Sequence, residues 1–348
     1  MARHFGAARV SDEILIWGAG AIGGTIGAYW VRAGQKVVFV DVVPEHVQAI
    51  RTTGLALEGP VEQFSVTGPA FLPADLGGKF KRIVLAVKAQ HTAAASKALL
   101  PHLADDGCVL SAQNGLNELT IARVAGERRT MGCFVNFGAD YLAPGRILFG
   151  GRGAVVVGEI DGTITERVRA MHALLQVFEP NAVLTGNIWG YLWGKLGYGA
   201  LLFATALTNE SIADALASPR HFDLYRRLAG EVMRVARGRG VQPLGFNGYE
   251  PAAFMPGATE AAARASIEAM VAHNRTSAKT HSGIWRDLAV RKRKTEIDAQ
   301  IAIVGPIALA LGVETPTLNR LVELIHDIED GRRKMDWATL DALAAETC

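Results

Sequence analysis

The stretch ILIWGAGAIGGTIGAYWVRAGQKVVFVD, residues 14–41, decides the fold of the first half of this chain. It begins with an apolar, β-prone run, ILIW, which predicts a buried strand at 14–17. A G-x-G-x-x-G turn follows at 18–23, and then a helical segment that Gly34 is placed to end. A second apolar run, KVVFV (36–40), leads directly into Asp41. This order of strand, glycine-rich turn, helix, strand and acid is typical of a dinucleotide-binding βαβ unit.

Each glycine of the turn has a physical reason in such a unit. The first permits the tight turn, the second lets the backbone approach a pyrophosphate, and the third lets the helix pack closely on the strand. The helix N-terminus adds free N–H groups and the positive end of its dipole. A glycine-rich turn without a ligand is the alternative, and the flanking strand, helix and acid disfavour it. The predicted cofactor-binding residues of the turn are Gly18, Ala19, Gly20, Ala21, Ile22 and Gly23.

Asp41 favours NAD over NADP. Its carboxylate can accept hydrogen bonds from the adenosine ribose hydroxyls. In NADP it would instead meet a phosphate that carries about −1.5 to −2 charges. The next residues, VVPEH (42–46), supply no Arg or Lys to neutralise that phosphate. We therefore expect NAD(H) as the cofactor, with a solvated strand end as the other interpretation of Asp41.

Further apolar runs predict four more strands, at 82–87, 108–112, 154–158 and 181–185. They are nearly continuous in Val, Ile and Leu, which is typical of parallel strands covered on both faces by helices. Lys88 follows the first of these runs and Asn114 follows the second. Ligands of open α/β sheets bind at the carboxyl ends of the strands, so both residues are candidates for cofactor binding. Asn114 is also a candidate for a substrate oxygen, and an ordinary turn residue is the alternative for each.

The composition and the apolar pattern of the chain change from about Asn187 onward. The long Ala-, Leu- and Arg-rich segments of this second half contain no convincing strand, so we expect an all-α region. One of them, GYLWGKLGYGALLFATAL (190–207), holds a single charge, Lys195. A buried Lys must shift its pKa or find a partner, whereas a Lys whose stem lies along apolar surface keeps its head in water. The segment by itself is compatible with either role.

Composition narrows the class of protein. The 348 residues are 49% hydrophobic and carry a net charge of +2, which favours large cores and gives no case for nucleic acid or a membrane as partner. Three scattered cysteines and no recognisable metal motif argue against disulfides and metal sites. The N-terminus has no apolar signal region, so a cytoplasmic protein is expected. The basic run RKRK (291–294) is interpreted as a solvated face ahead of a helix.

These motifs together resemble the ketopantoate reductase (2-dehydropantoate 2-reductase) family over nearly the whole length. The matching stretches are GAGAIGG, VKAQHT, SAQNGLNE, PGRILFGG with VVVGE, WGKL and TEID. The resemblance implies a Rossmann domain joined to an all-helical domain. With the change in sequence pattern near Asn187, we expect a flexible extension at 1–12, an α/β Rossmann-type dinucleotide-binding domain at 13–187 and an all-α substrate and catalytic domain at 188–348. The helical domain would be similar to the C-terminal domain of 6-phosphogluconate dehydrogenase. The family's active site lies in the cleft between its two domains.

The resemblance also implies roles for individual residues. The family's catalytic Lys matches Lys195, and its active-site Glu matches Glu296, and both would also contact the substrate. Its Lys and Asn at the strand ends match Lys88 and Asn114. A family Ser that binds the substrate carboxylate has its nearest candidate here in Ser282, at a different spacing. Lys195 would then donate a proton to the reacting oxygen or accept one from it.

Three positions depart from the family pattern. Members with ketopantoate activity carry Asn four and eight residues after the catalytic Lys, where this chain has Gly199 and Phe203. Phe203 is expected to make that side of the pocket more apolar, and Gly199 to open space. The family default is NADP(H), with an Arg after the second strand, where this chain has Asp41 and then Val42.

The resemblance implies reduction of the ketone of a 2-oxo acid, by default ketopantoate to pantoate in pantothenate biosynthesis. The departures favour an alternative, an NAD-dependent 2-hydroxy-acid dehydrogenase of the same superfamily with a bulkier or aromatic substrate. A non-catalytic dinucleotide-sensing protein is the alternative from another class, and it needs neither Lys195 nor Glu296. A homodimer is also possible, with the helical half as its surface.

Overall fold

The computed structural model describes residues 10–276 and 280–345 of the chain. It divides into two compact units, Met1–Ile188 and Trp189–Cys348, beside the boundary expected at 187/188. The first strand, β1 (Val10–Trp17), begins earlier than its apolar run. Val10 and Ser11 pair with β6, so residues 10–12 belong to the sheet and not to a flexible extension. Residues 1–9 of that predicted extension lie outside the described residues.

The first unit is built on an eight-stranded sheet of order β12-β11-β8-β7-β6-β1-β2-β5. All six strands expected from the apolar runs are in this sheet. The sheet also contains two strands that the apolar runs did not predict, β5 and β8. Besides β1, its strands are β2 (Val37–Val40), β5 (Ala70–Phe71), β6 (Lys79–Leu85), β7 (Leu103–Ser111), β8 (Thr130–Val135), β11 (Val155–Glu159) and β12 (Val183–Leu184).

One pairing differs from the parallel arrangement that the sequence suggested. β11 runs antiparallel to β8, whereas the neighbouring pairs from β8 through β7, β6 and β1 to β2 are parallel. The reason is the connection, because a parallel neighbour needs a long crossover, usually a helix. Between β8 and β11 the chain instead forms two further strands, β9 (Gly138–Ala143) and β10 (Arg146–Gly151), and returns in the opposite direction.

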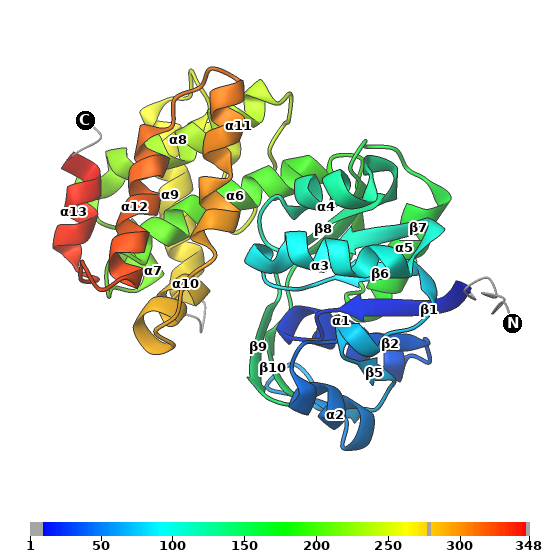
Figure 1. The fold of residues 1–348 in the computed structure, drawn as a ribbon. Coiled ribbons are helices and arrows are strands. Elements are labelled where there is room, and N and C mark those ends of the chain that lie inside the picture. Colours follow the sequence, from blue (N-terminus) through cyan, green and yellow to red (C-terminus); the bar gives the residue numbers. More distant parts are fainter. Residues whose placement is uncertain (1–9, 277–279, 346–348) are drawn as a thin grey trace, which may run out of the picture. The chain divides into compact units, whose positions relative to one another are not determined.

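Helices cover both faces of this sheet, which explains why runs such as ILIW (14–17) and VVFV (37–40) are buried on both faces. Alternate residues of a strand point to opposite faces, so Ile14 and Ile16 join one core and Leu15 and Trp17 the other. The first core is shared with α1 (Ala21–Arg32) and α5 (Glu166–Phe178). The second is shared with α3 (Thr92–Leu99) and α4 (Asn117–Ala125), which lie side by side in Figure 1.

A second, four-stranded sheet of order β4-β3-β10-β9 adds a feature that the sequence did not predict. Its other strands are β3 (Leu55–Glu58) and β4 (Phe64–Val66). These two strands are short, and β9 contains no buried residue, so the second sheet lacks the continuous apolar signal of the main sheet. Ile147 and Phe149 of β10 nevertheless join the same core as α1. The remaining segments of this unit are α2 (Pro44–Thr52), η1 (Pro73–Asp75), η2 (Ala89–His91), η3 (Leu100–His102) and η4 (Glu127–Arg129).

The second unit is helical, as expected; its described residues contain no strand. It is also where the basic run lies, and residues 291–294 are all exposed. None of the helices within the described residues is long and apolar enough to cross a membrane. The elements are α6 (Ile188–Thr205), α7 (Ile212–Leu216), η5 (Pro219–His221), α8 (Phe222–Gly238), η6 (Pro251–Phe254), α9 (Glu260–Thr276), α10 (Gly283–Trp285), η7 (Arg286–Val290), η8 (Asp298–Ala302), α11 (Val304–Ala310), α12 (Pro316–Glu329) and α13 (Trp337–Ala345).

A buried carboxylate stabilises the packing of two of these helices. Glu231 of α8 is 2% exposed. Its two oxygens accept hydrogen bonds from the backbone N–H groups of Thr317 at 3.0 Å and Leu318 at 2.8 Å. These amides are in the first turn of α12, where N–H groups have no partner within the helix. Glu231 therefore supplies the capping hydrogen bonds that the side chain of the N-cap residue, Thr315, does not make.

Candidate active site

Four of the predicted site residues follow neighbouring parallel strands at the same edge of the main sheet. Gly18 follows β1, Asp41 follows β2, and Lys88 and Asn114 lie just beyond β6 and β7. The pairing register aligns the strand ends, with Trp17 opposite both Val40 and Leu85, and Leu85 opposite Ser111. Lys88 and Asn114 are both exposed. The structure thus brings these four positions to one carboxyl edge, the place where open α/β sheets bind ligands.

The glycine turn has the close contacts that its pattern requires. Gly18 has a φ of +98°, and a Cβ there would lie 2.9 Å from the backbone of Ala86. A Cβ at Gly23 would lie 2.2 Å from the carbonyl oxygen of Gly18 and 2.9 Å from Ile16, so any larger residue would push α1 off the sheet. Gly20 differs, because a Cβ there would meet no atom within 4 Å. The open position is the one at which a pyrophosphate would approach the backbone.

Asp41 holds this turn in place through its own carboxylate. Oδ2 accepts a hydrogen bond from the backbone N–H of Ala19 at 3.0 Å, and Oδ1 accepts one from Val43 at 3.1 Å. Each carboxylate oxygen has more than one acceptor site, so both oxygens can also accept from a ribose hydroxyl. Asp41 is half-buried, which leaves part of the carboxylate accessible.

His46 is a site residue that sequence reasoning did not identify. It is completely buried, and its Nδ1 accepts a hydrogen bond from the backbone N–H of Gly145 at 2.9 Å. Since an amide N–H can only donate, Nδ1 carries no proton, and Nε2–H donates to the carbonyl of Ala19 at 2.8 Å. Asp41 and His46 therefore hold the two sides of Ala19. Gly145 lies 99 positions from His46, in the turn between β9 and β10, so no local pattern could have shown the contact.

The surroundings of Asp41 are acidic. The Tyr141 ring packs edge-on against His46, with the ring centroids 5.0 Å apart. Burial and then the nearby carboxylates of Asp41 and Glu45 raise the pKa of the Tyr141 phenol. The carboxylates of Asp41 and Glu45 therefore both lie near the Tyr141 phenol at this end of the sheet.

Lys195 lies near the middle of α6, a helix whose other side chains carry no charge. It is half-buried, and its neighbours Trp193 and Leu196 are buried. Gly199, one helical turn further on, is half-buried too, and a Cβ built there would meet no atom within 4 Å. Phe203 is completely buried, so the two departures from the family pattern differ: Gly199 leaves open space, whereas Phe203 contributes no exposed apolar surface.

Glu296 lies in the same unit, immediately before the helical segment that begins near Ile297. It is half-buried, and its carbonyl accepts a hydrogen bond from the backbone N–H of Gln300 at 2.9 Å. The preceding residue, Thr295, fixes the backbone, because its N–H and its hydroxyl both donate to Glu329 at 2.7 Å. The Thr295 hydroxyl also accepts from Ile297 N–H at 3.2 Å, which is a capping contact.

Ser282 has a structural partner of its own. Its hydroxyl accepts a hydrogen bond from the backbone N–H of Trp285 at 3.1 Å and so caps α10. The residue is only 3% exposed. A role in binding a substrate carboxylate would have to use the hydroxyl proton, and it remains a prediction. The neighbouring residues 277–279 lie outside the described part of the chain.

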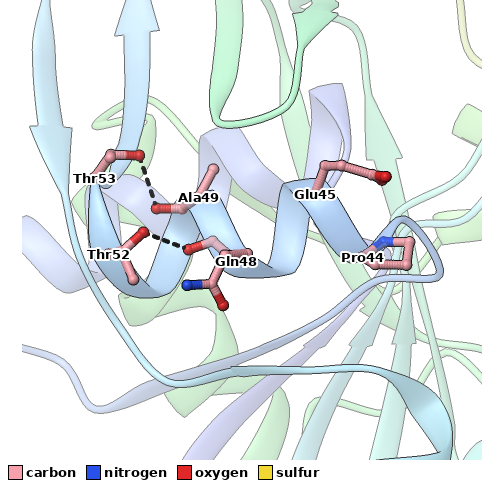
Figure 2. Close-up of a pocket in the computed structure, with 6 residues that line it drawn as sticks. All are labelled: Pro44, Glu45, Gln48, Ala49, Thr52 and Thr53. Carbon is pink, nitrogen blue, oxygen red and sulfur yellow. Dashed lines mark hydrogen bonds between the residues drawn. The ribbon is translucent and has the colours of Figure 1, made fainter.

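An open hollow on α2 shares only Glu45 with this arrangement. Figure 2 shows that two of its hydroxyls are used by the helix itself. Thr52 donates to the carbonyl of Gln48 at 2.8 Å, and Thr53 donates to that of Ala49 at 3.2 Å. Glu45 is the one charged side chain among the six lining residues. Elsewhere in the described residues no group of three or more His, Cys, Asp or Glu side chains could hold a metal ion.

Sequence comparison connects both units to one protein family. The pattern of the family "Ketopantoate reductase PanE/ApbA" matches residues 14–162, and that of its C-terminal region matches residues 187–329. The 2-dehydropantoate 2-reductase of Archaeoglobus fulgidus is 26% identical over 322 residues, which cover 92% of this chain and 99% of that protein. The enzyme of the same name from Mesorhizobium japonicum is 27% identical and covers 90% and 97%.

Solved structures show the same fold. The PanE/ApbA family ketopantoate reductase from Ralstonia eutropha JMP134 has a TM-score of 0.75 at 26% identity, with 92% of this chain and 99% of that chain covered. A D-mandelate dehydrogenase in ternary complex with NADH and anilino(oxo)acetate has a TM-score of 0.77 at 21% identity, with 92% and 98% covered. The expected fold class, an α/β dinucleotide-binding domain followed by a helical domain, is confirmed.

Proposed function

This chain belongs to the ketopantoate reductase (PanE/ApbA) family, and from that premise we propose that it reduces the ketone of a 2-oxo acid with NADH. As a member of that family it is an oxidoreductase that acts on CH–OH groups. The observation that carries the proposal is the alignment of Gly18, Asp41, Lys88 and Asn114 at one carboxyl edge. A dinucleotide extends across several strand ends, and this edge offers polar groups along its length.

The glycine turn fits a pyrophosphate. Gly20 leaves open space, and the first N–H groups of α1 have no partners within the helix. Lys88 would neutralise negative charge, and Asn114 would hydrogen-bond the nicotinamide-side ribose or a substrate oxygen. When bound, a nicotinamide nucleotide supplies the hydride for the carbonyl carbon.

NADH is favoured over NADPH by the charges at the adenosine end. The carboxylate of Asp41 can accept from the ribose hydroxyls but would repel a phosphate on the same ribose. Glu45 adds a second negative charge beside Tyr141. Residues 42–48 contain no Lys or Arg. The family default, NADP(H), remains the alternative, and a kinetic preference for NADPH over NADH would contradict the proposal.

The proton for the reduction would come from Lys195. Hydride addition to the carbonyl carbon leaves negative charge on the oxygen, and the ammonium would donate a proton to it. In the oxidative direction the neutral amine would take the proton from the hydroxyl. Glu296 would orient the Lys195 side chain and accept a hydrogen bond from the substrate. Ser282 remains a weaker candidate for the substrate carboxylate because its hydroxyl already caps α10.

Ketopantoate is the default substrate, and Gly199 favours a second candidate with a larger side chain. Position 199 faces the same side of α6 as Lys195, since residues four apart in a helix are neighbours. The open space there replaces an amide that family members with ketopantoate activity use. The D-mandelate dehydrogenase shares the fold, but at 21% identity the likeness extends to the fold alone. A bulkier or aromatic 2-oxo acid is therefore argued from Gly199 and not from that relative.

The test is a spectrophotometric panel. NADH and NADPH are each combined with ketopantoate, pyruvate, branched 2-oxo acids and benzoylformate, and nicotinamide absorbance is followed. Gly199→Asn should shift kcat/KM toward ketopantoate, while Gly199→Ala fills part of the space without supplying the amide. Tight NADH binding with no turnover on any member of the panel would instead support a dinucleotide sensor.

A further inference from the structure

Three buried side chains, joined in series by hydrogen bonds, connect the loops that follow β6 and β7. They are Gln113, Thr92 and Asn117, which are 5%, 1% and 4% exposed. Gln113 lies in the loop after β7, Thr92 is the first residue of α3, and Asn117 is the first residue of α4. The two helices that begin here are the pair that lies side by side on one face of the sheet in Figure 1.

The hydrogen bonds run without interruption from one loop to the other. Gln113 Nε2 donates to the carbonyl of Val87 at 2.8 Å and to Thr92 Oγ1 at 2.7 Å. Thr92 Oγ1 donates to Asn117 Oδ1 at 2.7 Å. Asn117 Nδ2 donates to the carbonyl of Asn114 at 2.6 Å. The two ends are therefore backbone carbonyls, one in each loop.

The two terminal carbonyls determine which group donates and which accepts in every hydrogen bond of this series. A carbonyl can only accept a hydrogen bond, so each amide must turn its NH₂ group toward its own end. The central group then has to accept from Gln113 and donate to Asn117. A hydroxyl can do both, which explains a Thr at position 92; Ser could replace it, whereas Val could do neither.

The two terminal carbonyls lie at the proposed cofactor site, one immediately before Lys88 and the other in Asn114. The carbonyl of Val87 belongs to the peptide group that also contains the N–H of Lys88, and the other carbonyl is that of Asn114 itself. The orientation of these peptides sets where the side chains of Lys88 and Asn114 begin. The pairing of β6 with β7 ends at Leu85 and Ser111. Strand pairing by itself therefore does not fix the position of one loop relative to the other.

We propose that Thr92 is a positioning residue that links the two loops, so that Lys88 and Asn114 meet the same bound nucleotide in one geometry. The inference rests on the proposed function, in which both residues bind the cofactor or substrate. Without the hydroxyl, two buried amides each lose a partner, and the loops gain freedom. A displacement of about 1 Å in such a site can lower the rate by roughly 100-fold.

The experiment compares Thr92→Val with Thr92→Ser in the full-length enzyme. Val keeps the shape of Thr without the hydroxyl, and Ser keeps the hydroxyl. We expect Thr92→Val to lower kcat/KM for NADH by about 10- to 100-fold and to weaken NADH binding in a fluorescence titration. Thr92→Ser should remain within about threefold of the wild type on both measurements. Rescue by Ser is a result that a loss of packing alone would not produce.

Thr208→Val is the matched control. Thr208 is also completely buried, and its hydroxyl likewise donates and accepts, to the carbonyl of Thr205 at 3.1 Å and from the N–H of Glu210 at 3.1 Å. It lies in the second unit, outside the proposed cofactor site. Both Val variants should lower the melting temperature, but only Thr92→Val should change the kinetic constants for NADH.

Lys88→Ala and Asn114→Ala separate the two ways in which the inference can fail. If they impair NADH binding or turnover and Thr92→Val does not, the positioning role is wrong and the proposed site stands. If all three variants retain normal binding and turnover, the cofactor assignment fails and the inference fails with it. Equal kinetic losses in Thr92→Val and Thr92→Ser would also overturn the role of the hydroxyl.

Discussion

The carboxyl edge of the first unit and the segment around Lys195 in the second present their polar groups in different ways. At the carboxyl edge, neighbouring parallel strands end side by side, so residues far apart in sequence arrive at one place by register. Hydrogen bonds between the side chains of Asp41 and His46 and the backbone of Ala19 then hold the glycine turn in place. In the helical unit, Lys195 and Glu296 come from elements that share no such edge. A sheet supplies binding geometry through its topology, whereas helices must supply it residue by residue.

The largest expected effect tests the chemistry assigned to the helical unit. Lys195→Ala should lower kcat by about 10²- to 10⁴-fold, the usual contribution of general acid–base catalysis, while the Kd for NADH stays nearly unchanged. Steady-state kinetics and a fluorescence titration measure the two quantities. Lys294→Ala is the control, because Lys294 is an exposed residue of the same unit whose Nζ lies 3.8 Å from Asp330 Oδ1. Loss of NADH affinity with kcat intact would remove the contrast between the two regions.

A second prediction compares two buried carboxyl groups, one in each unit. Glu231 has two backbone donors, whereas the carboxyl oxygens of Glu118 at the start of α4 have no hydrogen-bond partner in the described part of the chain. Burial raises the pKa of Glu118 to about 8, and its own backbone N–H, followed by nearby polar groups of Ser111 and Cys133, offsets only part of the shift.

The folded state therefore keeps a proton on Glu118 that the unfolded state releases above its ordinary pKa. The free energy of unfolding should fall as pH rises from about 4.5 to about 8 and then level off. Glu118→Gln should remove this loss and stabilise the protein by a few kcal/mol at pH 9, as measured by denaturant unfolding. Glu231→Gln should instead be destabilising at pH 7, because the amide NH₂ group cannot accept from one of the two backbone donors. An unchanged pH profile in Glu118→Gln would show that the carboxyl is not the titrating group.

A third prediction tests the carboxyl edge of the first unit through Asp41. Asp41→Ala removes the acceptor for Ala19 N–H and the proposed acceptor for the ribose, so the Kd for NADH should rise by about 10- to 100-fold, the value of a hydrogen bond to a charged group. The ratio of kcat/KM for NADPH to that for NADH should rise as well, because the repulsion is gone. Asp161→Ala is the control: its carboxylate also accepts from a backbone N–H, that of Thr163, at an exposed turn. An unaltered cofactor ratio would refute the role of Asp41.

The smallest expected effect concerns His46. His46→Ala removes the hydrogen bonds to Ala19 and Gly145, and NADH affinity should fall by about 10-fold with kcat nearly unchanged. His172→Ala provides the comparison, since His172 also hydrogen-bonds a backbone carbonyl, that of Ala182, outside the proposed site. If both variants lose stability and neither loses NADH affinity, His46 supports only the packing of β9 and β10.

The amino-acid sequence by itself determined the βαβ unit at 14–41, the strand ends that carry Lys88 and Asn114, and the helical nature of the second half. Each of these depends on a pattern within a short window, such as apolar period or glycine spacing, and such a pattern can be recognised without knowledge of any distant contact. The family resemblance added Lys195 and Glu296 to the predicted site residues. The antiparallel return of β11 and the second sheet were missed, because short or exposed strands carry little periodic signal.

Only the tertiary structure decided which side chains hold the site together. The contact between His46 and Gly145 spans 99 positions, and the chain from Gln113 through Thr92 to Asn117 joins the starts of two helices. Likewise, only burial distinguished Phe203, inside the fold, from Gly199 beside open space. The reason is physical: hydrogen bonding and burial depend on which faces of distant elements meet, and that is set by packing of the whole unit and not by local pattern.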